Sequence, residues 1–139
     1  MKAIFLFLFC LTALFCSAQY QFDLNERTRE NPNENIEVQT ITLDSLVSTH
    51  QIWIKQGVKA HFHEYHTEHV VVLSGKAKMS VNGEEFMIGP GDLIFIPKGS
   101  IHSVEVIGDE NLVVLSIQAP VFRGKDRIFV QAKVGGSSE

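Results

Sequence analysis

Residues 57–75 read GVKAHFHEYHTEHVVVLSG, and within them His61 and His63 stand one residue apart. Side chains on a β-strand alternate between its two faces, so these two imidazoles would share one face about 7 Å apart. Glu68 follows His63 after four residues, which leaves room for a turn and a neighbouring strand. The spacing predicts two imidazoles and a carboxylate on the inner face of one β-domain.

A second stretch, residues 91–106, reads GDLIFIPKGSIHSVEV and adds a third imidazole. His102 stands at the start of a predicted strand, just after Pro97-Lys98-Gly99. A single His-x-His is common and carries little weight alone. Three imidazoles and one carboxylate, however, make a ligand set of intermediate hardness, which suits divalent Fe, Mn, Ni, Cu, Co or Zn. The three histidines together with Glu68 therefore predict a site for one divalent transition metal ion.

Around these stretches the sequence predicts β-structure throughout. Short runs rich in Val, Ile and Phe recur at roughly the 8–12-residue spacing typical of sandwiches and barrels. Asn82-Gly83 is a strong hairpin signal because both residues tolerate positive φ. The only helical candidate is a turn at Asp44–Ser48, where Asp44 could cap the following amides. The predicted strands are Glu37–Leu43, Gln51–Lys55, Lys59–His63, His69–Leu73, Lys76–Asn82, Glu85–Ile88, Asp92–Ile96, His102–Ile107, Leu112–Gln118 and Arg127–Gln131.

The first stretch resembles the first motif of the cupin family. That motif runs from a glycine through His-x-His and a glutamate to a second glycine. Gly57, His61, His63, Glu68 and Gly75 match it here, with six residues between the glutamate and the last glycine. Only three residues separate the first glycine from the first histidine, where the family often has five. This departure loosens the entry turn and leaves the ligand spacing intact.

The second stretch resembles the second cupin motif, which runs from a glycine through Pro-x-Gly to a histidine and an asparagine. Gly91, Pro97, Gly99 and His102 match it, whereas Val106 stands in place of the asparagine. The contribution of that asparagine to the pocket is therefore absent. Fifteen residues separate the two motifs, close to the short end of the family's spacing.

The resemblance extends over about Ile36 to Gln131. It implies an all-β double-stranded β-helix, or jelly-roll barrel, with one divalent transition metal ion in its mouth. Cupins use such sites for dioxygenation, decarboxylation and isomerisation of small organic molecules, because the metal keeps open positions for substrate, water or dioxygen. A non-catalytic module that binds a metal or a small ligand is the alternative, and no catalytic residue is assigned. The ligands that the resemblance implies are His61, His63, Glu68 and His102.

The remaining histidines and aromatic residues have simpler interpretations. His66 and His69 are expected at the rim or in solvent, and His50 opens a strand without a partner. Glu64 and Tyr65 sit at the ligand turn, where a general acid or base could lie over the metal, but a solvated turn is the preferred interpretation. The residues expected in the core are Trp53, Phe86, Phe95 and Phe129, and those expected to line the pocket are Met79, Val81, Ile88, Leu93, Val104, Val106 and Leu115.

The first residues of the chain predict export. Lys2 is followed by a nearly unbroken apolar run, residues 3–16, and then by Ser17-Ala18. This order is typical of a secretory signal peptide, so we expect a periplasmic or secreted protein without a stable membrane anchor. The predicted parts are a signal peptide at 1–18, an extended polar lead-in at 19–35, the barrel at 36–131 and a flexible tail at 132–139.

The composition fits one globular domain. The chain has 139 residues, of which 45% are apolar and 20% charged. A net charge of −4 without a cluster of basic residues argues against nucleic acid as a partner. The expected partner is a small-molecule ligand or substrate. Both cysteines, Cys10 and Cys16, lie in the predicted signal peptide, so the exported chain would rely on its core or on a metal instead of disulfides. We expect a homodimer, because a barrel built from two sheets has open edges.

Overall fold

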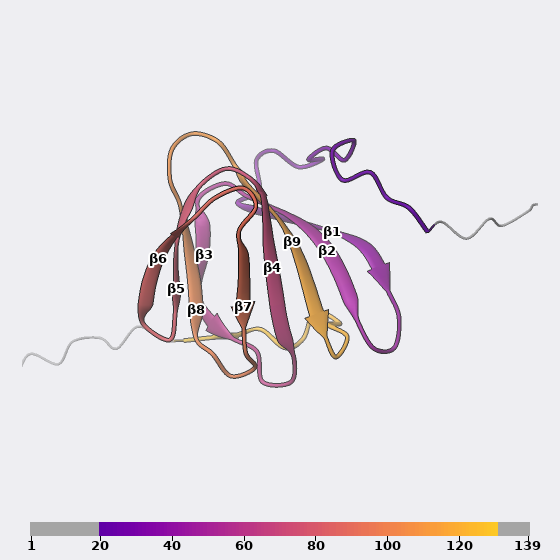
Figure 1. Ribbon diagram of the computed structural model, residues 1–139, viewed down its shortest axis with the longest axis vertical. Helices are drawn as coiled ribbons and strands as arrows, with labels where there is room; N and C mark the ends of the chain where they lie inside the picture. Colours follow the sequence, from indigo (N-terminus) through magenta and orange to yellow (C-terminus); the bar gives the residue numbers. More distant parts are fainter. Residues whose placement is uncertain (1–19, 131–139) are drawn as a thin grey trace, which may run out of the picture.

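The computed structural model describes residues 20–130, and over that range it contains ten β-strands and no helix (Figure 1). The predicted all-β class is therefore correct, and each predicted strand has a counterpart. The strands are β1 (Ile36–Leu43), β2 (Ser48–Ile54), β3 (Gly57–Phe62), β4 (Thr67–Ser74), β5 (Ala77–Val81), β6 (Glu84–Ile88), β7 (Leu93–Ile96), β8 (His102–Val106), β9 (Leu112–Ala119) and β10 (Ile128–Phe129).

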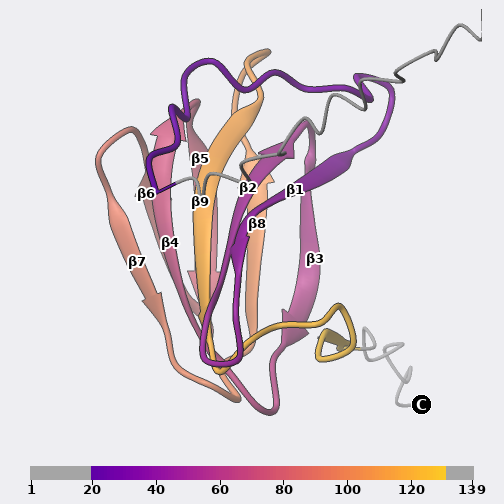
Figure 2. The ribbon, with the colours of Figure 1, turned by 90° about the vertical axis from the view of Figure 1, so that its right-hand side faces the viewer.

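The strands form two five-stranded antiparallel sheets that face each other (Figures 1 and 2). One sheet has the order β1-β2-β9-β4-β7 and the other has the order β10-β3-β8-β5-β6. The chain crosses between the sheets after β2, β3, β4, β6, β7, β8 and β9, so most neighbours in a sheet, apart from β1-β2 and β5-β6, are not consecutive in sequence. This arrangement is the predicted double-stranded β-helix.

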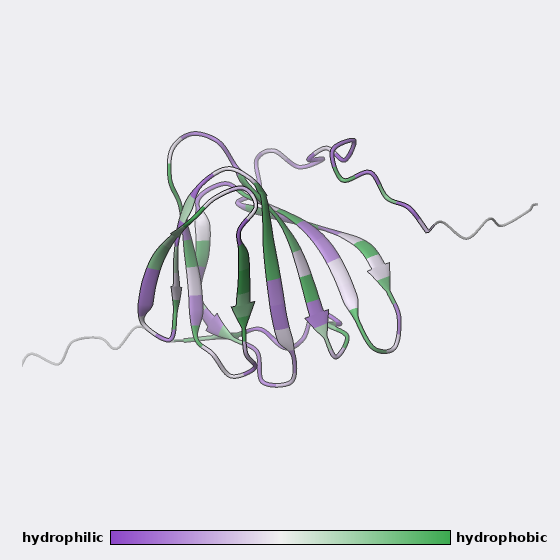
Figure 3. Ribbon diagram, viewed as in Figure 1, coloured by the Kyte–Doolittle hydropathy of each residue, from purple (hydrophilic) through white to green (hydrophobic). Residues whose placement is uncertain are grey.

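The hydrophobic core lies between the two sheets. Burial alternates along β4 and β9, as expected for strands with one face toward a core. Figure 3 shows apolar residues along β7 and the upper part of β4, whereas the lower end of β4 is polar. The barrel is thus packed at one end and lined by polar side chains at the other. The core consists of Ile52, Ile54, Val70, Val72, Ala77, Met79, Ile88, Ile94, Ile96, Leu112 and Val114.

Of two predicted turns, one forms as expected and the other takes a different conformation. Asn82 and Gly83 both have positive φ, 51° and 87°, and join β5 to β6 as the predicted hairpin. No helical turn forms at Asp44–Ser48. The Asp44 Oδ1 atom instead accepts hydrogen bonds from the amides of Leu46 and Val47, at 2.7 and 2.9 Å, and so stabilises a non-helical turn.

The polar lead-in is attached to the barrel more firmly than the sequence predicts. The Arg29 guanidinium lies 3.7 Å from the Glu37 carboxylate on β1. The Gln51 side chain of β2 donates to the carbonyl oxygen of Leu24 at 3.1 Å. Both faces of β2 are buried, since Gln51 and Trp53 on its outer face are only 2% and 6% exposed. The lead-in therefore covers the outer face of this strand.

Four side chains expected in the core or pocket lie on outer faces instead. Leu93 and Phe95 are 63% and 57% exposed, because the register of β7 turns Ile94 and Ile96 inward. Phe129 is 56% exposed on the short edge strand β10. Leu115 lies between the inward residues of β9 and points to the other face. These expectations were wrong because apolar runs such as LIFI do not reveal which alternate residue faces inward.

The predicted signal peptide, and the tail from residue 131 onward, lie outside the described residues. The domain boundaries that the sequence suggests remain predictions. Within residues 20–130, no helix is long and apolar enough to cross a membrane.

Candidate metal centre

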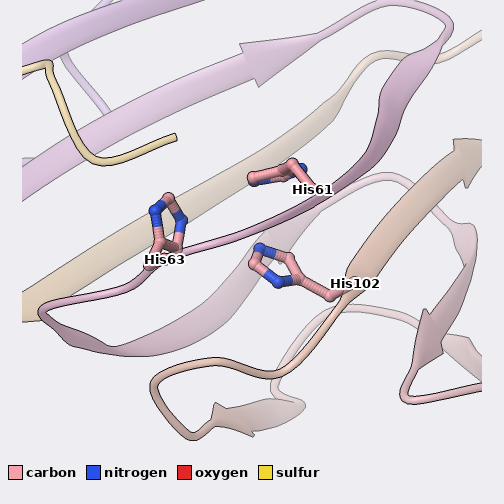
Figure 4. A group of neighbouring side chains, drawn as sticks. All are labelled: His61, His63 and His102. Atoms are coloured by element: carbon pink, nitrogen blue, oxygen red, sulfur yellow. The ribbon is translucent and has the colours of Figure 1, made fainter. Parts of the chain in front are cut away.

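The four predicted ligands come from both sheets and meet at the polar end of the barrel. His61 lies on β3 and pairs in register with His102, the first residue of β8. His63 directly follows β3, and Glu68 reaches the same point from β4 in the opposite sheet. Figure 4 shows the three imidazoles turned toward one another. The fold therefore brings together all four residues that the spacing singled out.

The four side chains are close enough to share one ion. A nitrogen of each histidine lies within 4.8 Å of a nitrogen of the other two. The Glu68 Oε2 atom lies 3.5 Å from the Nε2 atoms of both His63 and His102. Each of the four residues is at most 7% exposed. Such a convergent, buried set of three nitrogens and one oxygen is typical of a transition-metal site.

The backbone fixes the orientation of each imidazole. The Nδ1 atoms of His61, His63 and His102 lie 2.8, 2.7 and 3.0 Å from the carbonyl oxygens of Lys59, Asp126 and Ser100. A carbonyl oxygen only accepts hydrogen bonds, so each Nδ1 carries the proton and donates it. This is the usual outer support of a metal-binding histidine. Nε2 is then the atom that faces Glu68 or a metal ion: it offers a lone pair in the neutral imidazole and donates a hydrogen bond in the protonated one.

Glu68 is held in its ionised form. Its Oε1 atom accepts hydrogen bonds from the Ser116 hydroxyl and from the Gln118 side chain, the latter at 3.0 Å. Burial alone would raise the pKa of this carboxyl, but its contacts with His102, His63, Ser116 and Gln118 together lower the pKa well below 4.5. Oε2 is therefore a negatively charged atom that faces the imidazoles.

His61 is held in its neutral form. Its pKa is lowered to about 4, first by burial and then by the neighbouring His102. A metal ligand must offer a neutral imidazole or an ionised carboxylate. Residue types, protonation and Nε2 orientation thus all fit a divalent metal ion.

The sequence interpretation missed His66 and His50. His66 was expected at the rim, but it is 2% exposed, stacks on His63 with ring centroids 4.0 Å apart, and lies 2.8 Å from an oxygen of Asp126. His50 was expected to lack a partner, but it is 6% exposed and its Nδ1 lies 3.1 Å from the Thr40 hydroxyl. No sequence signal links His66 to a residue sixty positions later, so this pair could not be predicted.

Three other residues near the ligand turn behave as expected. Glu64 and Tyr65 are exposed, in agreement with a solvated turn. His69 is half-buried on the outer face of β4 and packs against Phe95, with ring centroids 5.2 Å apart. None of the three points into the candidate metal centre.

An apolar cavity of about 60 Å³ extends from the ligands into the core. Its wall includes His61, Glu68 and His102 and one further charged residue, Arg127. Three of the predicted pocket residues, Met79, Ile88 and Val104, line it, while Val81 and Val106 pack against the core. The cavity has space for a few water-sized molecules, so a larger ligand must approach from the mouth.

Comparison with known proteins identifies the family. The cupin domain model matches residues 50–118. An uncharacterized protein of Aquifex aeolicus is 31% identical over 111 residues, which cover 78% of this chain and 91% of that protein. A protein of Klebsiella pneumoniae with a double-stranded β-helix domain superposes with a TM-score of 0.66 at 21% identity, covering 74% of this chain and 91% of the other. The chain belongs to the cupin family.

Relatives with named activities match only part of their own length. Mannose-1-phosphate guanylyltransferase of Klebsiella pneumoniae is 35% identical over 83 residues, which cover 58% of this chain and 18% of that enzyme. Quercetin 2,3-dioxygenase of Bacillus subtilis is 42% identical over 43 residues, which cover 31% of this chain and 13% of that enzyme. The chain thus corresponds to less than a fifth of either enzyme.

Proposed function

We propose that this protein is a metal-dependent enzyme that acts on a small organic molecule. One divalent transition metal ion is held by His61, His63, Glu68 and His102. The observation that carries the proposal is the convergence of three imidazole nitrogens and one carboxylate oxygen beside an apolar cavity. Four protein ligands leave one or two positions open for substrate on a five- or six-coordinate metal ion, and sites with open positions are more often catalytic than structural.

Each part of the site has a distinct role in this proposal. The metal supplies Lewis acidity, which polarises an oxygen atom of a bound substrate. The carbonyl oxygens of Lys59, Asp126 and Ser100 keep the imidazoles oriented before and during binding. The apolar wall formed by residues such as Met79 and Ile88 excludes water, which strengthens electrostatic interactions near the ligands.

The reaction class is tested by activity with defined metals. The protein is stripped of metal and loaded separately with Fe, Mn, Ni, Cu, Co or Zn. Each form is then incubated with catechols, flavonols, β-diketones and keto-sugars, while oxygen uptake and ultraviolet absorbance are followed. Turnover by one loaded form, lost in His102→Ala and kept in the exposed-residue variant Glu64→Gln, supports an enzyme. The dioxygenase arm of this test is motivated by the similarity to quercetin 2,3-dioxygenase.

A non-catalytic binding module is the second candidate. Two observations favour it: the inner cavity is small, and among the described residues that line it only Arg127 is charged beyond the candidate ligands. Residues 20–130 thus supply no additional carboxylate or histidine to that wall for proton transfer. Full metal loading without turnover of any tested compound would favour the binding module.

We also propose that the protein is exported. The proposal rests on the order of residues 1–18, a basic start, an apolar centre and a small-residue end. Mass spectrometry of protein recovered from culture medium or periplasm should find a new terminus at Gln19. An exported form that still carries Lys2 would contradict this proposal.

A further inference from the structure

A groove lies outside the mouth of the barrel, next to the candidate metal centre. It has a volume of about 610 Å³, within the size range of sites for small organic ligands. The groove runs between the β1–β2 pair and the segment 122–129 that follows β9. Figure 2 shows this segment passing along the lower end of the barrel, beside the end of β3. Its apolar walls are formed by Val38, Leu43, Phe122 and Phe129.

Arg127 connects this groove with the inner cavity, because its side chain lines both. Its Nε atom is buried and has no hydrogen-bond partner, and the ion pairs found within residues 20–130 do not include Arg127. A partly buried guanidinium without a counter-charge is unfavourable, since it has lost water without gaining an acceptor. An anionic oxygen group between groove and cavity would supply that acceptor.

Two further observations agree with an anionic ligand. Arg123 also lines the groove, and none of the described residues that line it is a carboxylate. His50 lines the groove as well, and its Nε2 atom is buried without a hydrogen-bond partner. The groove therefore combines apolar walls with two positive charges and a spare imidazole nitrogen.

We propose that the groove binds small amphipathic substrates whose anionic oxygen group pairs with Arg127 while the apolar part lies between Phe122, Phe129 and β1. The proposal rests on the proposed function in placing this ligand beside the metal. A guanidinium offers two parallel N–H donors to a carboxylate or phosphate, which makes Arg127 a specificity-determining residue. An ion held by three neutral imidazoles and one carboxylate keeps a net positive charge, and this charge would favour the same ligands.

Binding of three matched compounds tests the proposal. Calorimetry on the zinc-loaded full chain compares 3-phenylpropanoate, its neutral amide and 2-phenylethyl phosphate. We expect at least one of the two anions to bind ten times more tightly than the amide. Arg127→Gln should abolish this preference, and Arg127→Lys should retain part of it, since Lys keeps the charge but loses the paired donors. Lys125→Gln is the control, because it removes an exposed positive charge of the same segment that does not line the groove.

The metal-free protein separates this inference from the proposed function. If the groove recognises anions through Arg127, the preference persists without zinc and is still lost in Arg127→Gln. Failure to load any metal together with a persisting preference would overturn the proposed function alone. Equal binding of acid and amide, or an unchanged preference in Arg127→Gln, would overturn the inference. Absence of binding by all three compounds, as in a groove filled by a second copy of the chain, would also overturn it.

Discussion

His63 and Asp126 are joined by a hydrogen bond between the His63 Nδ1 atom and the Asp126 carbonyl oxygen, 2.7 Å apart and 63 residues apart in sequence. The carboxylate of the same aspartate accepts the amides of Glu64 and Tyr65, both at 2.9 Å, and pairs with His66. The turn that carries a candidate ligand and the segment after β9 are therefore one structural unit. The same segment after β9 forms one side of the groove lined by Arg127.

Asp126→Ala should weaken both the fold and the metal site. Burial raises the pKa of the Asp126 carboxyl, but the hydrogen bonds from the two amides and the nearby His66 and His63 together lower it. Its removal leaves these groups without a partner, at a cost of about 1–3 kcal/mol in unfolding free energy. The variant keeps the backbone carbonyl that contacts His63, but the segment that positions this carbonyl loses its link to the ligand turn. We therefore expect metal affinity to fall by about 10-fold. Urea unfolding and chelator competition measure both, with exposed Asp109→Ala as control. Equal behaviour of the two variants would refute the role of Asp126.

Gly75→Ala should be far more damaging than Gly83→Ala, although both glycines have positive φ, 80° and 87°. A methyl group at Gly75 would collide with the backbone oxygen of Asn111 and lie 2.8 Å from the Leu112 Cα, whereas at Gly83 it would meet only open space. The conformational cost of about 1–2 kcal/mol is common to both variants, so the difference between them measures the collision. We expect Gly83→Ala to fold and Gly75→Ala to lose most of its cooperative unfolding transition. Similar urea midpoints would show that the strands approach less closely than described.

The metal-free protein should lose stability in mild acid. The pKa of His61 is about 4 in the folded state and about 6.5 in an unfolded chain, so the unfolded chain binds more protons between these values. Stability therefore falls as pH decreases below about 6.5, by about 2 kcal/mol between pH 7 and pH 5 from this residue. The lowered pKa values of His50 and His66 act in the same direction. Denaturant titrations at both pH values should show a smaller decrease for His61→Gln; an equal decrease would contradict the assignment.

A homodimer remains a prediction, and the structure suggests where to test it. Leu93 and Phe95 expose most of their side chains on β7, which lies at the edge of its sheet. Unpaired edges and exposed apolar residues favour association with another chain. We expect sedimentation at micromolar concentration to give a dimer that Phe95→Lys converts to a monomer. A wild-type monomer would contradict the prediction.

The sequence was sufficient to predict the fold class and to single out the four residues that lie together at the candidate metal centre. The positions of His61, His63 and Glu68 follow from local spacing. The two histidines share a face of one strand, and the turn after them is short enough for the next strand to bring Glu68 back beside them. The protonation states of the site, by contrast, depend on partners far along the chain. Ser116 and Gln118 lie about fifty residues from Glu68, and nothing in their sequence setting marks them as its partners.

Burial was the least predictable property. The run at Leu93–Ile96 is apolar throughout, so its pattern could not show that Ile94 and Ile96 face the core. Arg127 was part of a predicted strand and received no role. Its proposed part in ligand binding depends on its position between the inner cavity and the groove, which the sequence does not reveal. Features that arise from alternation and local spacing were thus predictable, and features that arise from register and loop packing were not.

The metal content of the purified protein tests the candidate metal centre directly. The full chain is exposed to each divalent metal in turn, freed of unbound metal, and analysed by mass spectrometry for metal per chain. We expect about one ion per chain in the wild type and none above background in His61→Ala/His63→Ala/His102→Ala, while a His66→Gln control retains the ion. Full occupancy in the triple variant, with the fold confirmed by circular dichroism, would show that the metal ion binds elsewhere.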